Sequence, residues 1–223
     1  MPWKAVLFDL DGTLVETAPE IADAVNDTLQ HMGWPVVAQA DVNRWIGHGT
    51  RELLILALAY HSGQPTPQVR DSALLRAALP VFDIHYQAHC GKRSQLYPKV
   101  RETLAALRAQ GCRLAVVTNK EARYTDTVLR AHALQSTFDV VISGDTFPTK
   151  KPDPTSVLTL LAQWNIEPSQ ALFVGDSSID AATARNAGLP VWLLPYGYNM
   201  GESVEACRPD RVIQDISALL ATG

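Results

Sequence analysis

KAVLFDLDGT, residues 4–13, is the strongest structural signal in the sequence, because a short apolar run leads directly into two carboxylates and a glycine. An unbroken apolar run of this length predicts a buried strand of a parallel sheet. Side chains alternate along a strand, so Asp9 and Asp11 face one side while Leu10 faces the other. Taken alone, the pattern also fits a strand that ends in an ordinary Asp-Gly turn.

Four more apolar runs alternate with helical patterns in the second half of the chain. The runs are RLAVV (113–117), FDVVI (138–142), ALFV (171–174) and VWLL (191–194). The helical patterns between them occupy residues 121–133, 154–164 and 178–187. Alternating strands and helices imply right-handed crossovers and a parallel sheet. We therefore predict an α/β fold with a Rossmann-like parallel-sheet core and helices on both faces.

Residues 16–92 have a different character, with helical periodicity throughout and no convincing strand. Apolar residues recur there at helical spacing, for example at Ile21, Val25, Leu29 and Met32. We predict a small all-helical cap at 16–92, inserted after the first strand of a catalytic α/β core made of residues 1–15 and 93–223. Such an insert can lie over the carboxyl edge of the sheet like a lid.

Polar residues follow the apolar runs where the strands should end. Asp9 follows the first run, and Thr118 and Asn119 follow the second. Asp176 stands just after the run at 171–174. The carboxyl ends of parallel strands share one edge of the sheet, and ligands bind at that edge where the strand order switches. This coincidence favours a functional site at Asp9 and Asp11 over a plain turn.

The predicted edge gathers up to four negative charges, on Asp9, Asp11, Asp176 and Asp180. At about 4 Å and an effective dielectric near 20, each like-charged pair costs on the order of 4 kcal/mol, whereas a domain is stable by only about 5–15 kcal/mol. A compensating cation is therefore implied. Because the candidate ligands are oxygens, with no histidine or cysteine among them, a hard ion such as Mg²⁺ is favoured over zinc.

A site with carboxylates, a divalent cation, a lysine and a hydroxyl suits phosphoryl transfer. Asp9 would attack phosphorus and form an aspartyl phosphate, which divides one difficult displacement into two easier steps. Asp11 would protonate the departing alkoxide and later remove a proton from the hydrolytic water. The phosphoryl oxygens would be held by Thr118, Asn119, Lys151 and backbone amides that come close at Gly12.

Four motifs resemble those of the haloacid dehalogenase superfamily of phosphatases: FDLDGT (8–13), VVTN (116–119), KPDP (151–154) and GDSSID (175–180). The resemblance implies that Asp9 is the nucleophile and Asp11 the acid/base, with Thr118 and Lys151 binding phosphate. It also implies that Asp176 and the backbone carbonyl of Asp11 bind the metal, with Asp180 in support. Asp180 would equally suit the first turn of a helix, where the dipole favours an acid. The helical insert resembles the first type of cap in this superfamily.

The superfamily also contains dehalogenases and phosphomutases, so the fold leaves the reaction open. Asp11 argues against dehalogenation, because a halide leaving group needs no acid. The β-phosphoglucomutases carry a cap histidine where this chain has Ile21, and they tend to have valine where it has Thr13. Both differences favour hydrolysis. A non-catalytic protein that binds phosphate or metal would have no use for Asp11.

Further segments resemble bacterial phosphoglycolate phosphatases, a branch of the superfamily: ETAPEI (16–21), IGHGT (46–50), YP (97–98), TNK (118–120) and PYGYN (195–199). This resemblance implies hydrolysis of 2-phosphoglycolate to glycolate and phosphate. A substrate with a carboxylate would suit a cationic lid residue, for which Arg51 and His48 are the candidates. Arg51 could equally be a solvated charge. The alternatives are a related phosphatase for pyrophosphate, a sugar phosphate or a nucleoside monophosphate, and a phosphomutase.

Composition limits the partners and the location. A net charge of −4, without a basic stripe, argues against nucleic acid. The apolar stretch LLILALAY (53–60) is far shorter than the roughly 20 residues that span a bilayer. The N-terminal run lacks the form of a signal peptide, and three widely spaced cysteines fit free thiols. We predict a cytoplasmic enzyme, monomeric or homodimeric, that acts on a small phosphorylated metabolite.

Overall fold

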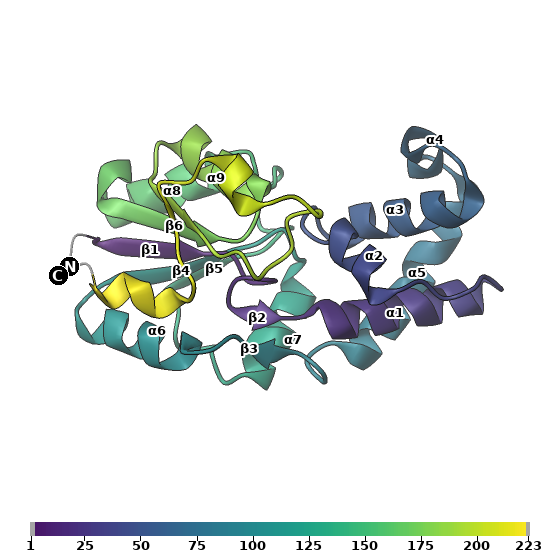
Figure 1. Cartoon of the computed structure of the whole chain (residues 1–223), viewed down its shortest axis with the longest axis horizontal. Coiled ribbons are helices and arrows are strands. Elements are labelled where there is room, and N and C mark those ends of the chain that lie inside the picture. Colours follow the sequence, from purple (N-terminus) through teal and green to yellow (C-terminus); the bar gives the residue numbers. More distant parts are fainter. Residues whose placement is uncertain (1–2, 222–223) are drawn as a thin grey trace.

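The computed structural model describes residues 3–221, and within them six parallel strands form one sheet in the order β5-β4-β1-β6-β7-β8 (Figure 1). β1 (Ala5–Phe8) is central and pairs with β4 (Arg113–Val117) on one side and β6 (Ala171–Gly175) on the other. The remaining strands are β5 (Val140–Ile142), β7 (Val191–Leu193) and β8 (Arg211–Val212). The Rossmann-like parallel sheet predicted from the sequence is confirmed.

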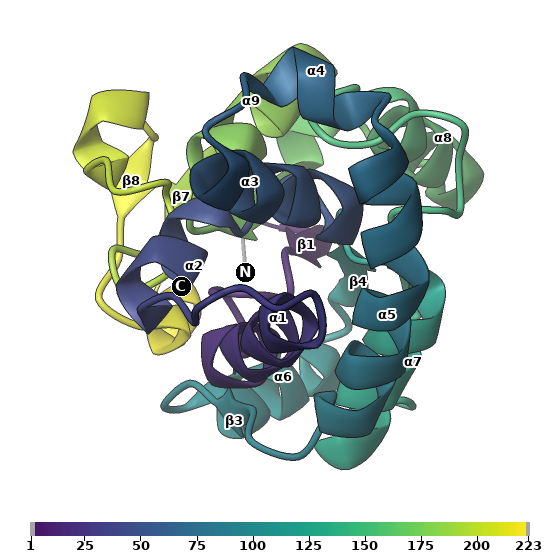
Figure 2. The same cartoon turned by 90° about the vertical axis from the view of Figure 1, so that its right-hand side faces the viewer.

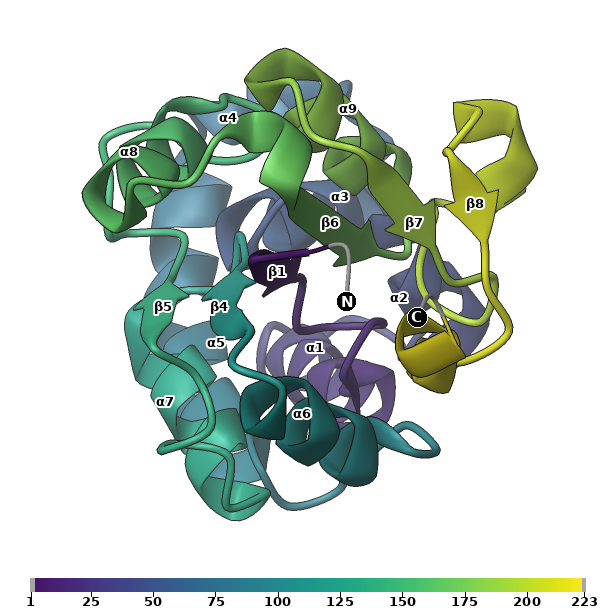
Figure 3. The same ribbon diagram turned by 90° about the vertical axis from the view of Figure 1, so that its left-hand side faces the viewer.

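Alternate side chains of the central strand pack on opposite faces of the sheet. Val6 and Phe8 belong to a core cluster on the side of α6 and α7, whereas Leu7 belongs to a second cluster on the side of α8 and α9. Figure 3 shows these two helix layers on either side of the sheet. The two-residue period of a strand therefore explains why β1 is apolar throughout. The helices are α6 (Val100–Ala109), α7 (Ala122–Ala131), α8 (Thr155–Trp164) and α9 (Ser178–Ala187).

A group of helices follows β1 and lies beyond the carboxyl edge of the sheet, at the right of Figure 1. α1 packs against α5 and α2, and α3 packs against α5. Figure 2, which looks onto this group, shows α1, α2 and α3 in front of β1. The segment is helical as predicted, while its limits at 16 and 92 stay a prediction. The helices are α1 (Ala18–His31), α2 (Gln39–Trp45), α3 (Thr50–Ser62), α4 (Thr66–Arg70) and α5 (Ala73–His89).

A two-stranded antiparallel ribbon joins the segments that enter and leave these helices. It pairs β2 (Val15–Glu16) with β3 (Gln95–Leu96). The buried carboxylate of Glu20 strengthens the junction, because its Oε2 accepts hydrogen bonds from the backbone N–H groups of Gly91 at 2.9 Å and Ser94 at 3.0 Å. Neither this ribbon nor β8 was predicted from the sequence, because strands of two residues carry no alternation pattern.

Short 3-10 helices complete the described chain: η1 (Pro168–Gln170), η2 (Val204–Cys207) and η3 (Ile216–Ala221). η3 packs beside α6 at the amino end of the sheet. Among residues 3–221, none of the helices combines the length and the apolar character needed to cross a membrane.

Candidate active site

Asp9 and Asp11 stand where β1 ends at the carboxyl edge of the sheet. The N–H of Asp9 still donates to the carbonyl of Val174 in β6 at 3.0 Å, so the ladder of hydrogen bonds reaches this residue. The chain then turns at Gly12, whose φ of 87° suits glycine, and the N–H of Gly12 donates to the carbonyl of Val15 at 2.9 Å. Both carboxylates consequently line one cavity.

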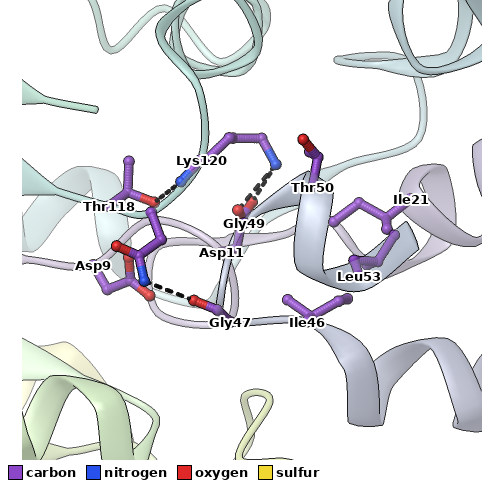
Figure 4. A pocket seen from close by; sticks show the side chains of 11 residues that line it. Asp9, Asp11, Ile21, Ile46, Gly47, Gly49, Thr50, Leu53, Thr118 and Lys120 are labelled. Carbon is purple, nitrogen blue, oxygen red and sulfur yellow. Dashed lines mark hydrogen bonds and ion pairs between the residues drawn. The ribbon is translucent and has the colours of Figure 1, made fainter. Parts of the chain in front are cut away.

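The cavity lies between the sheet edge and helices α1 and α3, and Figure 4 shows it from close by. The cavity is narrow, with about 30 Å³ of free space, so the helices stand close over the core. The helical side contributes an apolar wall of Ile21, Ile46 and Leu53. The polar side chains that line the cavity are those of Asp9, Asp11, Thr50, Thr118, Asn119 and Lys120.

Lys151 lies between two carboxylates. Its Nζ is 2.9 Å from Asp9 Oδ1 and 2.7 Å from Asp180 Oδ1, and the lysine side chain is almost fully buried. Burial by itself would lower the pKa of Lys151, but the charges of Asp180 and Asp9 outweigh it and raise that pKa above its usual value. Lys151 therefore keeps its positive charge at a place where it can neutralise an anion.

Beside Lys151 lies a group of three acids, Asp9, Asp176 and Asp180, each of which offers an oxygen within 4.8 Å of the other two. Burial raises the pKa of Asp176 well above its usual range, and the charges of Asp180 and Asp9 raise it further. Burial also raises the pKa of Asp9 to about 7, although Lys151 opposes this shift. A bound cation would relieve both shifts, and an all-oxygen donor set fits a hard ion such as Mg²⁺.

The carboxylate of Asp176 is held on both sides. Thr13 Oγ1 donates to Asp176 Oδ1 at 2.5 Å, and the backbone N–H of Tyr198 donates to Oδ2 at 2.6 Å. Gly12 and Gly197 pack so closely against this carboxylate that a Cβ at either position would collide with it. Asp176 is therefore fixed in one orientation beside Asp9.

Asp180 has both oxygens engaged by the protein. Its Oδ2 accepts hydrogen bonds from Ser177 Oγ at 2.7 Å and from the N–H of Asp176 at 3.1 Å, while Oδ1 contacts Lys151. Ser177 and Asp180 form a capping box at the start of α9. The helix-start interpretation of Asp180 is confirmed, and its supporting role at the metal stays a prediction.

Thr118 and Asn119 follow β4 and use their side chains differently. Thr118 Oγ1 accepts a hydrogen bond from the N–H of Lys120 at 3.2 Å and faces the cavity, so its own hydrogen can be donated there. Asn119 Nδ2 donates to the carbonyls of Gly47 and Lys151, both at 3.1 Å. Its Oδ1 accepts no hydrogen bond from any described residue. Asn119 therefore ties the loop before α3 to the core.

Lys120 also lines the cavity, although no role was predicted for it from the sequence. Its Nζ lies 3.0 Å from Asp11 Oδ1 and 2.9 Å from Oδ2, and Thr17 Oγ1 donates to Asp11 Oδ1 at 2.6 Å. Burial would lower the pKa of Lys120, but the charge of Asp11 outweighs it and raises that pKa. Two features of the sequence could have pointed to Lys120. It directly follows Asn119, and a largely buried Asp11 needs a cation nearby.

His48 and Arg51 were predicted to bind the carboxylate of the substrate. Neither residue lines this cavity. Both are exposed, and Arg51 Nη2 donates to the carbonyl of Arg70 at 3.2 Å. Their neighbours Gly49 and Thr50 do line the cavity. Successive residues of a helix point about 100° apart, so the place of Arg51 beside Thr50 in α3 did not reveal which of the two side chains faces inward.

These features define a class of protein: an α/β enzyme that gathers buried acids, a lysine and a hydroxyl at the carboxyl edge of a parallel sheet, beneath a group of helices. A sequence model of the haloacid dehalogenase-like hydrolase family matches residues 6–194. The chain belongs to this family, as its four motifs predict.

Named relatives match nearly the whole chain. A phosphoglycolate phosphatase of Nitrosospira multiformis is 42% identical over 217 residues, which cover 97% of this chain and 93% of the relative. One of Vibrio cholerae is 41% identical and covers 97% and 95%. A crystal structure described as a predicted phosphoglycolate phosphatase from Haemophilus somnus is 34% identical, with a TM-score of 0.93 and coverage of 99% and 98%. The structure of CbbY from Rhodobacter sphaeroides with phosphate is 26% identical, with a TM-score of 0.79 and coverage of 97% and 96%.

Proposed function

We propose that the protein is a Mg²⁺-dependent phosphomonoester hydrolase that converts 2-phosphoglycolate to glycolate and phosphate. The observation that carries the proposal is the contact of Asp9 with Lys151 beside Asp176 and Asp180. It joins a nucleophile, a cation and a group of oxygen ligands at one cavity. The relatives named phosphoglycolate phosphatase support the choice of substrate.

Hydrolysis would proceed through two displacements and an aspartyl-phosphate intermediate. In the first, a carboxylate oxygen of Asp9 bonds to phosphorus, the bond from phosphorus to the glycolate oxygen breaks, and Asp11 gives that oxygen a proton. In the second, water attacks phosphorus, Asp11 takes a proton from the water, and the bond to Asp9 breaks to release phosphate. The hydroxyl of Thr118 and the ammonium of Lys151 would hold the phosphoryl oxygens in both steps.

The metal would be held by Asp9, Asp176 and the backbone carbonyl of Asp11, with Asp180 in support. When bound, Mg²⁺ supplies positive charge against the phosphoryl oxygens and against the crowded carboxylates. The chain prepares its own ligands for this task, because Thr13 holds Asp176 in place and the turn at Gly12 brings Asp11 near Asp9.

We also propose that residues 16–92 act as a cap that excludes water during the reaction. Two hydrogen bonds join its loop and α3 to the core beside the cavity: Asn119 Nδ2 to the carbonyl of Gly47 at 3.1 Å, and Thr50 Oγ1 to Glu121 Oε1 at 2.6 Å. Gly47 and Gly49 have φ values of 132° and 90°, which other residues rarely adopt. Opening at this loop would let the products leave.

A carboxylate-binding role for Arg51 or His48 stays a prediction, and it requires the loop at 46–50 to move. The test compares KM for 2-phosphoglycolate with KM for ethyl phosphate, which has no carboxylate. An increase for 2-phosphoglycolate alone in Arg51→Met or His48→Gln would support the role. Unchanged KM values for both substrates would exclude it.

We place the enzyme in the cytoplasm, as a monomer or homodimer that acts on a small phosphorylated metabolite and binds neither nucleic acid nor membranes. The cysteines of the described chain, Cys90, Cys112 and Cys207, are free thiols, and this supports a reducing compartment. Sedimentation of the purified protein would measure its oligomeric state.

The main alternative is a phosphatase of the same family for pyrophosphate, a sugar phosphate or a nucleoside monophosphate. A phosphate-release screen with Mg²⁺ against these compounds and 2-phosphoglycolate tests the choice, and we expect the highest kcat/KM for 2-phosphoglycolate. A much higher kcat/KM for one of the other compounds would overturn the choice of substrate but leave the phosphatase class intact. Failure to release phosphate from any of them would overturn the class. A phosphomutase, disfavoured by the apolar Ile21 in the cavity wall, would require an activating bisphosphate.

A further inference from the structure

We propose that Lys120 positions Asp11 for proton transfer, and that Tyr86 of the cap helix α5 holds Lys120 in place for this task. The inference rests on the proposed phosphatase function, which makes Asp11 the proton donor to the leaving group. Lys120 acts through Asp11 rather than on the phosphoryl group. Its contact with α5 makes the orientation of Asp11 depend on the position of the cap.

The contact between Lys120 and Asp11 restricts the carboxylate strongly. Nζ lies within 3.0 Å of both carboxylate oxygens, and Figure 4 shows the pair at the cavity wall. The side chain of Lys120 is 2% exposed and that of Asp11 is 12% exposed, so water competes little for either group. Thr17 Oγ1 holds Oδ1 as well, at 2.6 Å. Charge-assisted hydrogen bonds to both oxygens fix the plane of the Asp11 carboxylate.

Tyr86 provides the link from Lys120 to the cap. Lys120 Nζ lies 5.0 Å from the centroid of the Tyr86 ring, within the range of a cation–π interaction. The ring is fully buried and packs on Tyr124 of α7, with the two centroids 4.3 Å apart. No hydrogen bond joins the Tyr86 hydroxyl to Lys120 or Asp11 in the described part of the chain, so the ring makes the contact with Lys120. Lys120 is thus held between an acid of the core and an aromatic ring of the cap.

The neighbours of Lys120 in the sequence also contact the cap. Asn119 Nδ2 donates to the carbonyl of Gly47, and Glu121 Oε1 accepts a hydrogen bond from Thr50 Oγ1. The residues directly before and after Lys120 therefore both contact the cap. Displacement of the cap would break these contacts together and take the Tyr86 ring away from Lys120. The full set of contacts that orients Lys120 and Asp11 therefore exists only while the cap covers the cavity.

The dependence of kcat on the leaving group distinguishes a role of Lys120 in proton transfer from a merely structural role. The alkoxide that leaves ethyl phosphate needs a proton, whereas the nitrophenolate that leaves p-nitrophenyl phosphate departs without one. We expect Lys120→Met to lower kcat for ethyl phosphate roughly 10- to 100-fold more than kcat for p-nitrophenyl phosphate, because Asp11 is misplaced. In an Asp11→Asn background, Lys120→Met should not change the ratio of the two kcat values further.

A matched pair at Tyr86 tests the link to the cap and leaves the ion pair untouched, so it serves even where Lys120→Met does not fold. Tyr86→Leu removes the ring and should lower the ratio of kcat for ethyl phosphate to kcat for p-nitrophenyl phosphate about threefold or more. Tyr86→Phe keeps the ring and should retain the wild-type ratio.

Three results would overturn the inference. The first is an equal loss of kcat on both substrates in Lys120→Met or in Tyr86→Leu. The second is a further fall of the ratio when Lys120→Met is added to Asp11→Asn. The third is an effect of Lys120→Met confined to KM for 2-phosphoglycolate, which would assign Lys120 to the substrate carboxylate instead. A wild-type enzyme that releases no phosphate from any substrate would reject the proposed function, which is a separate failure.

Discussion

Thr13 and Asp176 are joined by a hydrogen bond of 2.5 Å between Thr13 Oγ1 and Asp176 Oδ1, although 163 positions of sequence separate them. Thr13 stands in the turn after β1 and Asp176 directly after β6, and these two strands are neighbours in the sheet. The bond prevents the carboxylate from rotating away from Asp9. The geometry of the candidate metal site therefore depends directly on the order of the strands.

Mg²⁺ should stabilise the folded protein as well as support activity. Asp9, Asp176 and Asp180 repel one another in a buried place, and an ion that binds only the folded state relieves this repulsion. At 100 times its Kd, such an ion raises the free energy of unfolding by about 2.7 kcal/mol. Thermal melts in EDTA and in saturating Mg²⁺ measure the shift, which Asp176→Asn should largely remove. Full phosphate release in EDTA would contradict the role of the metal.

Gly12→Ala should weaken metal binding, and Gly33→Ala is its matched control. Both glycines have positive φ, 87° and 77°, so alanine carries a similar backbone cost of about 1–2 kcal/mol at either position. A Cβ at Gly12 would collide with the carboxylate of Asp176, whereas a Cβ at Gly33 has nothing within 4 Å. We expect the Mg²⁺ concentration for half-maximal activity to rise at least about tenfold in Gly12→Ala only. The same Mg²⁺ requirement in both variants would refute the importance of this packing.

Asp9→Asn should keep the fold and abolish turnover. The amide has nearly the same shape as the carboxylate but cannot form the acyl-phosphate bond. Because burial disfavours the charge of Asp9, we also expect no loss of melting temperature in EDTA. Phosphate release and circular dichroism measure the two effects. Substantial residual hydrolysis by a variant that still binds Mg²⁺ would exclude the covalent route.

Asp83→Asn should reduce stability near neutral pH but not in acid. Asp83 of α5 accepts a hydrogen bond from Tyr124 Oη and pairs with Arg123 Nη1, both at 2.6 Å. Partial burial raises the pKa of Asp83, but the bond from Tyr124 and the contacts with Gln87 and Arg123 outweigh it and lower that pKa. A lowered folded pKa stabilises the protein above the unfolded pKa of about 3.9, and this contribution disappears as pH falls through the folded pKa.

Urea denaturation at pH 7 should therefore show a loss of about 1 kcal/mol in Asp83→Asn. The loss should shrink toward zero in acid, as the pH falls through the lowered folded pKa of Asp83. Asp126 of α7 offers a control, because it is exposed and has no ion pair or hydrogen bond from its side chain in the described part of the chain, so Asp126→Asn should change stability little at either pH. A loss of the same size at both pH values would assign the effect of Asp83 to packing rather than to charge.

Local patterns in the sequence were enough to predict the parallel sheet, the helical segment after β1 and the motif residues. Unbroken apolar runs such as 113–117 indicate strands that are covered on both faces, and β4 lies there. The placement of Asp9, Asp11 and Thr118 followed from a simple rule, because each stands after a strand and parallel strands end at one edge. Membership of the haloacid dehalogenase-like family, predicted from four short motifs, is confirmed.

The contacts of individual side chains needed the folded chain. Lys120 reaches Asp11 and Tyr86 because the segments that follow β4 and β1 meet beside α5, and Arg51 faces away from the cavity because of the rotation of α3. Asn119 likewise donates to the carbonyls of Gly47 and Lys151 because the fold brings these distant segments together. Periodicity along one segment reports which residues are buried, but the rotation and distance of that segment against its neighbours come from packing between parts of the chain that are remote in sequence.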